Sequence, residues 1–170
     1  MRAMPNLQTT AVTVTLTIDS SIPAPPYNVA TCSTLITYSD NSNITVPGWG
    51  IAAIGTPQGP GAAFNVTVKD SNLSPIASIV NWALTCIPRA PTTSASPFGN
   101  NASSIGGSGS VPGAGGGLGL NFGNTNNPSN NNPRIKNAGT WDWSLMVQVV
   151  CADGVTVKCF GSDPEMEVGA

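Results

Sequence analysis

The carboxylates near the C-terminal end have the spacing that comes closest to a catalytic arrangement. Asp163 and Glu165 stand two residues apart and Glu167 follows at the same interval, so a strand would project all three from one face. Glycosidases place two carboxylates across a sugar bond. The alternative, which we favour, is a turn at Asp163-Pro164 followed by acids that protect the edge of a last strand. Because the chain has no histidine, Ser-His-Asp and Cys-His arrangements are excluded, and we expect no enzymatic activity.

Sites for a metal ion or a cofactor have little support in the sequence. Asp142, Asp153 and Asp163 would bind calcium only if the fold brought them together, because their spacing is not that of an EF-hand. The glycine run at 113–117 has the composition of a phosphate-binding loop, but neither a helix nor a lysine follows it. We therefore expect no metal and no cofactor.

Tryptophan side chains are the best candidates for contact with a ligand or partner. Indole rings stack on the faces of sugars and anchor protein interfaces. Trp49 lies in a Pro-Gly-Trp-Gly turn and is the one that we expect to be exposed. Trp141 and Trp143 share one face of an expected strand, where they either contact a ligand or fill the core.

The four cysteines Cys32, Cys86, Cys151 and Cys159 form no C-x-x-C pair. A structural zinc site would have to gather thiolates from distant strands. We interpret the cysteines as buried free thiols, which pack as small hydrophobic side chains. A disulfide such as Cys32–Cys86 is the alternative for an exported protein.

Low charge sets limits on the partners of this chain. Charged residues make up 8% of the sequence and the net charge is −2, whereas charged residues are roughly 25% of an average globular protein. Arg134 and Lys136 are the closest basic pair, so the cluster of cations that binds nucleic acid is missing. A surface with so little charge repels its own copies weakly, which favours a homo-oligomer.

No apolar run is long enough to span a membrane or to act as a secretory signal, and we expect a cytoplasmic protein.

Period-two alternation predicts an all-β domain over residues 1–170. Ala11 to Ile18 alternates apolar residues with threonine, as in a half-buried strand. Further strands are expected over about 29–38, 51–54, 62–68 and 78–87, the last of them covered on both faces. Short strands separated by turn residues indicate an antiparallel β-sandwich or jelly roll.

A hairpin follows the clearest strand of the chain. Residues 140–151 alternate so that one face carries Trp141, Trp143, Leu145, Val147, Val149 and Cys151. Asp153-Gly154 is a strong turn signal, 155–160 returns as the partner, and 166–168 adds a last short strand. A two-residue loop puts Cys159 opposite Gln148, and a three-residue loop separates Cys151 and Cys159 by about 13 Å. Neither register allows these two cysteines to bond.

The segment at about 88–139 is rich in Gly, Asn, Ser and Pro, and we expect a long irregular insertion. Its apolar residues Leu118, Leu120 and Phe122 stand at alternate positions, which a plain linker does not need. We expect residues 118–122 to form a short edge strand or an arm that packs on its own sheet or on another subunit.

The C-terminal residues resemble those of a known family. Trp141 to Val150 (WDWSLMVQVV), the Asp153-Gly154 turn and the tail Phe160 to Val168 (FGSDPEMEV) are similar to the end of the bacterial inclusion-body protein family, the PixA/AidA group. Residues 12–20 (VTVTLTIDS) are similar to the first strand of that family. The resemblance implies a cytoplasmic β-sandwich that self-associates, sometimes into inclusions, with carbohydrate binding in some members.

Two functions remain open at this point. The first is a non-catalytic, self-associating protein of the inclusion-body type, with lectin-like glycan binding as a further activity. The second is an exported structural or adhesive subunit of an appendage, capsid or cell surface, which assembles through its strands and the 88–139 arm.

Overall fold

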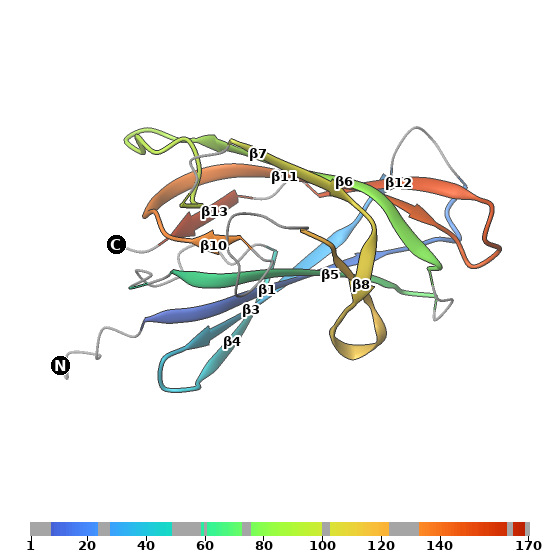
Figure 1. Ribbon diagram of the computed structural model, residues 1–170, viewed down its shortest axis with the longest axis horizontal. Helices are drawn as coiled ribbons and strands as arrows, with labels where there is room; N and C mark the ends of the chain where they lie inside the picture. Colours follow the sequence, from blue (N-terminus) through green and yellow to red (C-terminus); the bar gives the residue numbers. More distant parts are fainter. Residues whose placement is uncertain are drawn as a thin grey trace.

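Two β-sheets face each other across an apolar core in the computed structural model (Figure 1), which describes residues 8–23, 28–48, 59, 61–72, 76–99, 103–122, 133–162 and 165–168. Sheet A has the order β4-β3-β1-β5-β9-β8, and β10 also pairs with β5. Sheet B has the order β2-β12-β11-β6-β7, and β13 also pairs with β11. The strands of sheet A are β1 (Thr9–Ile18), β3 (Thr31–Tyr38), β4 (Asn43–Pro47), β5 (Ala62–Asp70), β8 (Ser110–Pro112), β9 (Leu118–Leu120) and β10 (Arg134–Ile135). Those of sheet B are β2 (Asn28–Val29), β6 (Ser78–Pro88), β7 (Ser104–Ser108), β11 (Gly139–Val150), β12 (Val157–Ser162) and β13 (Glu165–Val168). The predicted all-β sandwich is confirmed.

Strand pairing is mixed rather than purely antiparallel. β1 pairs with β5 in parallel, and β12 pairs with β2 in parallel, while the other strand pairs are antiparallel. The chain leaves β1, forms β2, β3 and β4, and then returns to the free edge of β1 as β5. A connection of that length can return to the starting end of its neighbour, which a tight hairpin cannot do.

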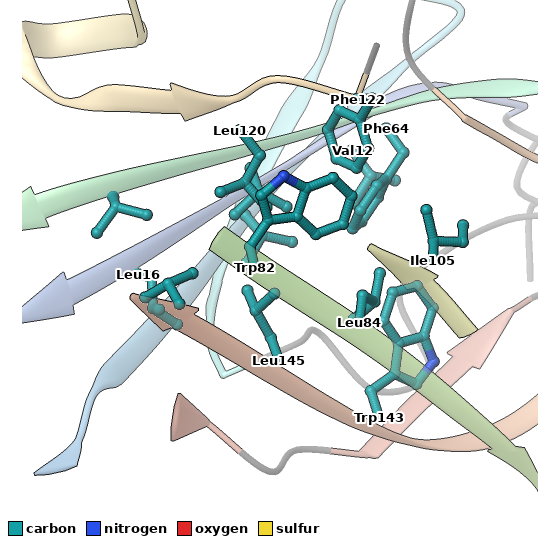
Figure 2. Close-up of a cluster of buried hydrophobic side chains, with 14 of the residues drawn as sticks. Val12, Leu16, Phe64, Trp82, Leu84, Ile105, Leu120, Phe122, Trp143 and Leu145 are labelled. Atoms are coloured by element: carbon teal, nitrogen blue, oxygen red, sulfur yellow. The ribbon is translucent and has the colours of Figure 1, made fainter. Parts of the chain in front are cut away.

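The strands with clear alternation place their apolar residues as predicted. Val12, Val14, Leu16 and Ile18 of β1 are at most 1% exposed, and the apolar face of β11 is at most 9% exposed as far as Cys151. Aromatic rings join the two sheets (Figure 2): Phe64 of β5 contacts Trp143 of β11 at a centroid distance of 5.5 Å. Trp82 of β6 meets Phe122, which follows β9, at 4.8 Å in an edge-to-face arrangement. The core therefore depends on residues far apart in the sequence.

β6 differs from its prediction. It lies between β11 and β7, and only one of its faces is covered by the other sheet. Ala83 and Ile87 point outward and are exposed, and the register shifts at Val80. The expectation of a strand covered on both faces was wrong, because small and apolar residues on the outer face made the run look continuously buried.

The C-terminal hairpin has the two-residue register. Gln148 pairs with Cys159, and the Cys151 N–H donates to the Thr156 carbonyl at 2.8 Å. The Asp153 carboxylate accepts the N–H groups of Val155 and Thr156, which stabilises the turn. The two cysteines of this hairpin are therefore not bonded to each other.

The segment 88–139 carries strands over its described residues. β7 ends sheet B, β8 ends sheet A, and Gly109 between them has φ +81, a conformation that favours glycine. The chain thus switches from one sheet to the other at this corner, as strands of sandwiches do at their edges. β9 pairs with both β5 and β8, so Leu118 to Leu120 lies within the molecule's own sheet A. Leu120 and Phe122 are 3% and 7% exposed, and Leu118 packs against the core.

Candidate interaction surface

Asp142 and Asp153, two acidic residues of the C-terminal region, lie far apart: Asp142 is in β11 and Asp153 is in the turn after it. Asp142 pairs in register with Glu165 and forms an ion pair with Arg89, Nη2 to Oδ1 2.8 Å. Asp163 lies outside the described residues. Asp153 sits beyond the far end of β11, and the strand from residue 142 to 150 alone spans about 26 Å. The calcium arrangement considered from the sequence is therefore not formed, and the described residues hold no group of three His, Cys, Asp or Glu side chains able to bind a metal.

Asp19 and Asp70 lie where β1 and β5 end, and their carboxylates accept hydrogen bonds that stabilise the adjoining turns. Asp19 accepts hydrogen bonds from the Ser21 N–H (2.9 Å), the Ser21 hydroxyl (2.6 Å) and the Asn72 amide. These bonds, the Ser21 hydroxyl first, lower the pKa of Asp19. Lys158 of β12 donates to the carbonyls of Ser20 and Ile22 beside it. The lysine side chain thus connects sheet B to the turn that follows β1.

The tryptophans occupy two very different situations. Trp141 and Trp143 are fully buried, and the Trp141 indole N–H donates to the Ser94 carbonyl at 3.1 Å. Neither can contact a ligand as the molecule stands, because every alternate position of β11 faces the core. Trp49 lies outside the described residues, so its contact role stays a prediction.

The cysteines are free, with Cys86 and Cys151 buried and Cys32 and Cys159 half-buried. Burial raises the pKa of Cys32 and of Cys86 to about 12. Cys32 pairs in register with Leu16, whereas Cys86 pairs with Trp143, which contacts Phe64 opposite Val12. Four strand residues, about 13 Å, separate Val12 from Leu16. This exceeds the reach of a disulfide, so the Cys32–Cys86 bridge considered from the sequence is not possible in this fold.

The glycine run packs against the outer face of β5. A Cβ on Gly117 would lie 2.6 Å from Thr67 Cγ2 and 2.7 Å from the Val68 carbonyl, and one on Gly113 would lie 2.8 Å from the Gly119 nitrogen. Thr67 is only 4% exposed as a result. The glycines are needed for this close approach of the backbone.

The outer face of sheet B is the surface that stands out chemically. It exposes Ile87 (63%), Met146 (47%) and Val157 (45%) on three neighbouring strands. Met146 lies between Ala83 of β6 and Gly161 of β12. These neighbours have small side chains or none, so they do not cover the methionine side chain. Ile87 pairs with Asp142, Met146 with Ala83 and Val157 with Val150, so these apolar positions follow one another at intervals of about 13 Å along the sheet. We call the set Ala83, Ile87, Met146 and Val157 the sheet B patch.

Polar groups lie between the members of the sheet B patch: the pairs Ser144–Thr85 and Gln148–Asn81 separate its rows, and Asp142 stands opposite Ile87. Asn81 donates through its side-chain amide to the Gln148 side chain at 3.0 Å, so these two polar groups satisfy each other. The described charged side chains of this face are Arg89 and Asp142, which neutralise each other at one end. Charge on the described part of this face is thus confined to one ion pair, and three apolar side chains are 45% to 63% exposed, so we treat the face as a candidate interface.

Sequence reasoning missed the sheet B patch, although a signal was present. The outward positions of β11 read Thr, Asp, Ser, Met, Gln and Val, so Met146 and Val150 break the polar half of the alternation. The sequence analysis considered the tryptophans on the inward face of this strand and did not consider Met146 and Val150 on its outward face.

Comparison with known proteins adds no relative: no family model, no curated protein and no solved structure matches this chain. Within the part of the chain that the structure describes, no helix has the length and apolar character to cross a membrane.

Proposed function

We propose that this chain is a non-catalytic protein whose function is to associate with copies of itself, in the manner of an inclusion-body or storage protein. The single observation that carries the proposal is the sheet B patch, in which Ile87, Met146 and Val157 are 45% to 63% exposed. Removal of apolar surface from water stabilises an interface by about 25 cal/mol per Å².

A second copy is the occupant best suited to the sheet B patch. The chain has 8% charged residues and a net charge of −2, so two copies approach with little repulsion. The Arg89–Asp142 pair offers both signs at one end of the face, and a two-fold related copy offers the same pair in return. A strongly charged partner would find no complementary field on the described part of this surface.

Glycan binding is a separate part of the proposal. Trp82, Trp141 and Trp143 are at most 4% exposed and cannot stack on a sugar. Lectin-like activity therefore rests on Trp49 alone.

The proposal is tested by the molar mass in solution, measured by light scattering across a dilution series. We expect an oligomer, and we expect Met146→Glu to shift the assembly toward monomer at every concentration. Thr31→Glu places the same charge on an exposed position of sheet A and is the matched control, expected to keep the wild-type mass. A wild-type protein that stays monomeric at high concentration, or a Met146→Glu variant with unchanged mass, would overturn the proposal.

A further inference from the structure

β4 forms one edge of sheet A, on the side away from β1 (Figure 1). It pairs with β3 in an antiparallel register that joins Ser33 to Pro47 and Thr37 to Asn43. Its residues Asn43, Ile44, Thr45, Val46 and Pro47 include no charge. Ile44 is 46% exposed.

The hydrogen-bond pattern shows which backbone groups of β4 face outward. The Gly48 N–H donates to the Cys32 carbonyl at 2.8 Å, and the Tyr38 N–H donates to the Ser42 carbonyl at 3.0 Å. Hydrogen-bonded pairs recur at every second residue of an antiparallel ladder, so Ile44 and Val46 also bond to β3. The N–H and C=O groups of Asn43 and Thr45, and the C=O of Pro47, therefore point away from the sheet.

The other described edge strands of at least four residues carry features that oppose pairing. β13 contains Glu165 and Glu167, and charged residues on an edge discourage a further strand. β7 contains Gly106 and Gly107 among its five residues, which weakens it as a template. β4 has two β-branched apolar residues, and its one protective feature is Pro47 at the very end.

We propose that β4 pairs antiparallel with β4 of a second copy, with Thr45 on the two-fold axis. In this register the Thr45 N–H donates to the Thr45 carbonyl of the second copy, and reciprocally. The Asn43 N–H donates to the Pro47 carbonyl of the other chain, so the missing N–H of Pro47 costs only the bond to the Asn43 carbonyl. Each outward N–H of the strand finds an acceptor.

Side chains match in the same register. Ile44 stands opposite Val46 of the second copy in a non-hydrogen-bonded pair, where the side chains approach most closely. Both residues lie on the core face of the sheet, since Ile44 pairs with the buried Ile36, and Val46 already packs against the core. Pairing thus extends the apolar core across the two-fold axis and covers the exposed surface of Ile44. With no charge on either strand, nothing repels.

This inference rests on the proposed self-association but uses a surface separate from the sheet B patch. An interface with two-fold symmetry closes at a dimer, and growth beyond a dimer needs a second contact. β4 and the sheet B patch lie on different sheets, so one copy can use both at once. The two contacts together give an assembly that continues to grow.

The test is amide hydrogen exchange of the full chain, measured by NMR at a low and a high protein concentration. We expect the Asn43 and Thr45 amides to exchange fast in dilute protein and at least tenfold more slowly in concentrated protein. The amides of Ile44 and Val46, bonded to β3 in either state, are the internal control and stay protected at both concentrations. Protection of Asn43 and Thr45 that is independent of concentration would overturn the proposal.

A pair of variants identifies the backbone as the cause. Thr45→Pro removes the outward N–H while leaving the bonds to β3 in place, and we expect at least a tenfold rise in the dimer dissociation constant. Thr45→Ala keeps the N–H and is expected to dimerise like the wild type. Continued protection of Ile44 and Val46 in Thr45→Pro shows that the hairpin is intact. An assembly whose mass is unchanged by Thr45→Pro, with this hairpin intact, refutes the β4 interface alone, because loss of that interface leaves only the sheet B contact and must reduce the mass. A wild-type monomer at all concentrations refutes self-association itself.

Discussion

The outer faces of the two sheets differ, although the inner faces are equally apolar. The outer face of sheet A carries hydroxyl side chains, with Thr13, Thr15 and Thr17 on β1, and the glycine run covers Thr67. The outer face of sheet B exposes Ile87 and Met146, and no described segment of the chain packs over either residue. The protein thus uses its own chain to cover part of one face and leaves an apolar surface on the other.

The inner faces of the sheets are determined by folding, whereas the outer faces can differ according to function. Folding needs an apolar inner face on each sheet, and both sheets have one. The outer faces are free of that requirement, so polar residues are the default and apolar ones need an explanation. Sheet A departs from the default at Leu35 (39% exposed) and Val111 (43%), and sheet B departs from it further, at Ile87 (63%) and Met146 (47%), where we place an interface.

The largest effect is expected where the glycine run covers sheet A. In Gly117→Ala the new Cβ would lie 2.6 Å from Thr67 Cγ2 and 2.7 Å from the Val68 carbonyl, and overpacking of this kind costs about 2–3 kcal/mol. Gly116→Ala is the control: it meets nothing within 4 Å, and its positive φ costs about 1 kcal/mol. Denaturant unfolding measures both. Equal losses would mean that the run does not pack on β5, and the contrast between the faces would then disappear.

The same comparison shows how far sequence reasoning reaches. β1 and β11 were predicted with the correct inward residues because a buried face imposes period two on a strand. The Asp153-Gly154 turn likewise fixed the pairing of Gln148 with Cys159 as one of two alternatives. These features depend on neighbours in the sequence.

Features that depend on distant partners were not predicted. β7 reads Ser-Ile-Gly-Gly-Ser and is a strand because β6 pairs with it, with only Ile105 facing the core. β4 escaped notice because it is short and polar at one end. The parallel pairing of β1 with β5 has no signal in the sequence of either strand. Exposure of Met146 also required the structure, since an outward apolar residue is recognised only when nothing covers it.

Acid is expected to lower the free energy of unfolding by less than Gly117→Ala does. The loss comes from two carboxylates, one beside each sheet. Asp19 belongs to sheet A and is bonded to Ser21 and Asn72; Asp153 belongs to sheet B and is bonded mainly to Thr156. Hydrogen bonds lower the pKa of each carboxyl in the folded state. Their contribution is therefore complete above the unfolded pKa, about 3.9 for Asp, and is lost as the pH falls through the folded pKa.

Two variants separate the contributions of these carboxylates. Asp19 links residues far apart in the chain, whereas Asp153 holds only its own turn. The charge of Lys158 lowers the pKa of both carboxyls and does not distinguish them. We expect Asp19→Asn to flatten the loss of unfolding free energy below about pH 4 more than Asp153→Asn does. Urea unfolding at a series of pH values provides the measurement. Identical acid slopes in the two variants and the wild type would contradict a role for either carboxylate.

The smallest effect on stability is expected at the charged end of sheet B. The Arg89–Asp142 pair is close to half exposed, with side chains 49% and 42% accessible, and exposed pairs contribute about 0.5 kcal/mol. The Arg89 N–H still donates to the Thr140 carbonyl when the side chain is removed. Arg89→Ala should therefore unfold almost like the wild type.

Association should respond to Arg89→Ala more than folding does. Without the guanidinium, Asp142 keeps Glu165 as its register partner, and the face ends in uncompensated negative charge. A second copy meeting the sheet B patch then experiences like-charge repulsion, so the mass measured by light scattering should fall at low salt and recover at high salt, where charges are screened. Arg89→Lys keeps the positive charge and is the matched control. A mass that falls equally at both salt concentrations would place the role of Arg89 in packing rather than in charge, and a mass that does not fall would move the association away from this end of sheet B.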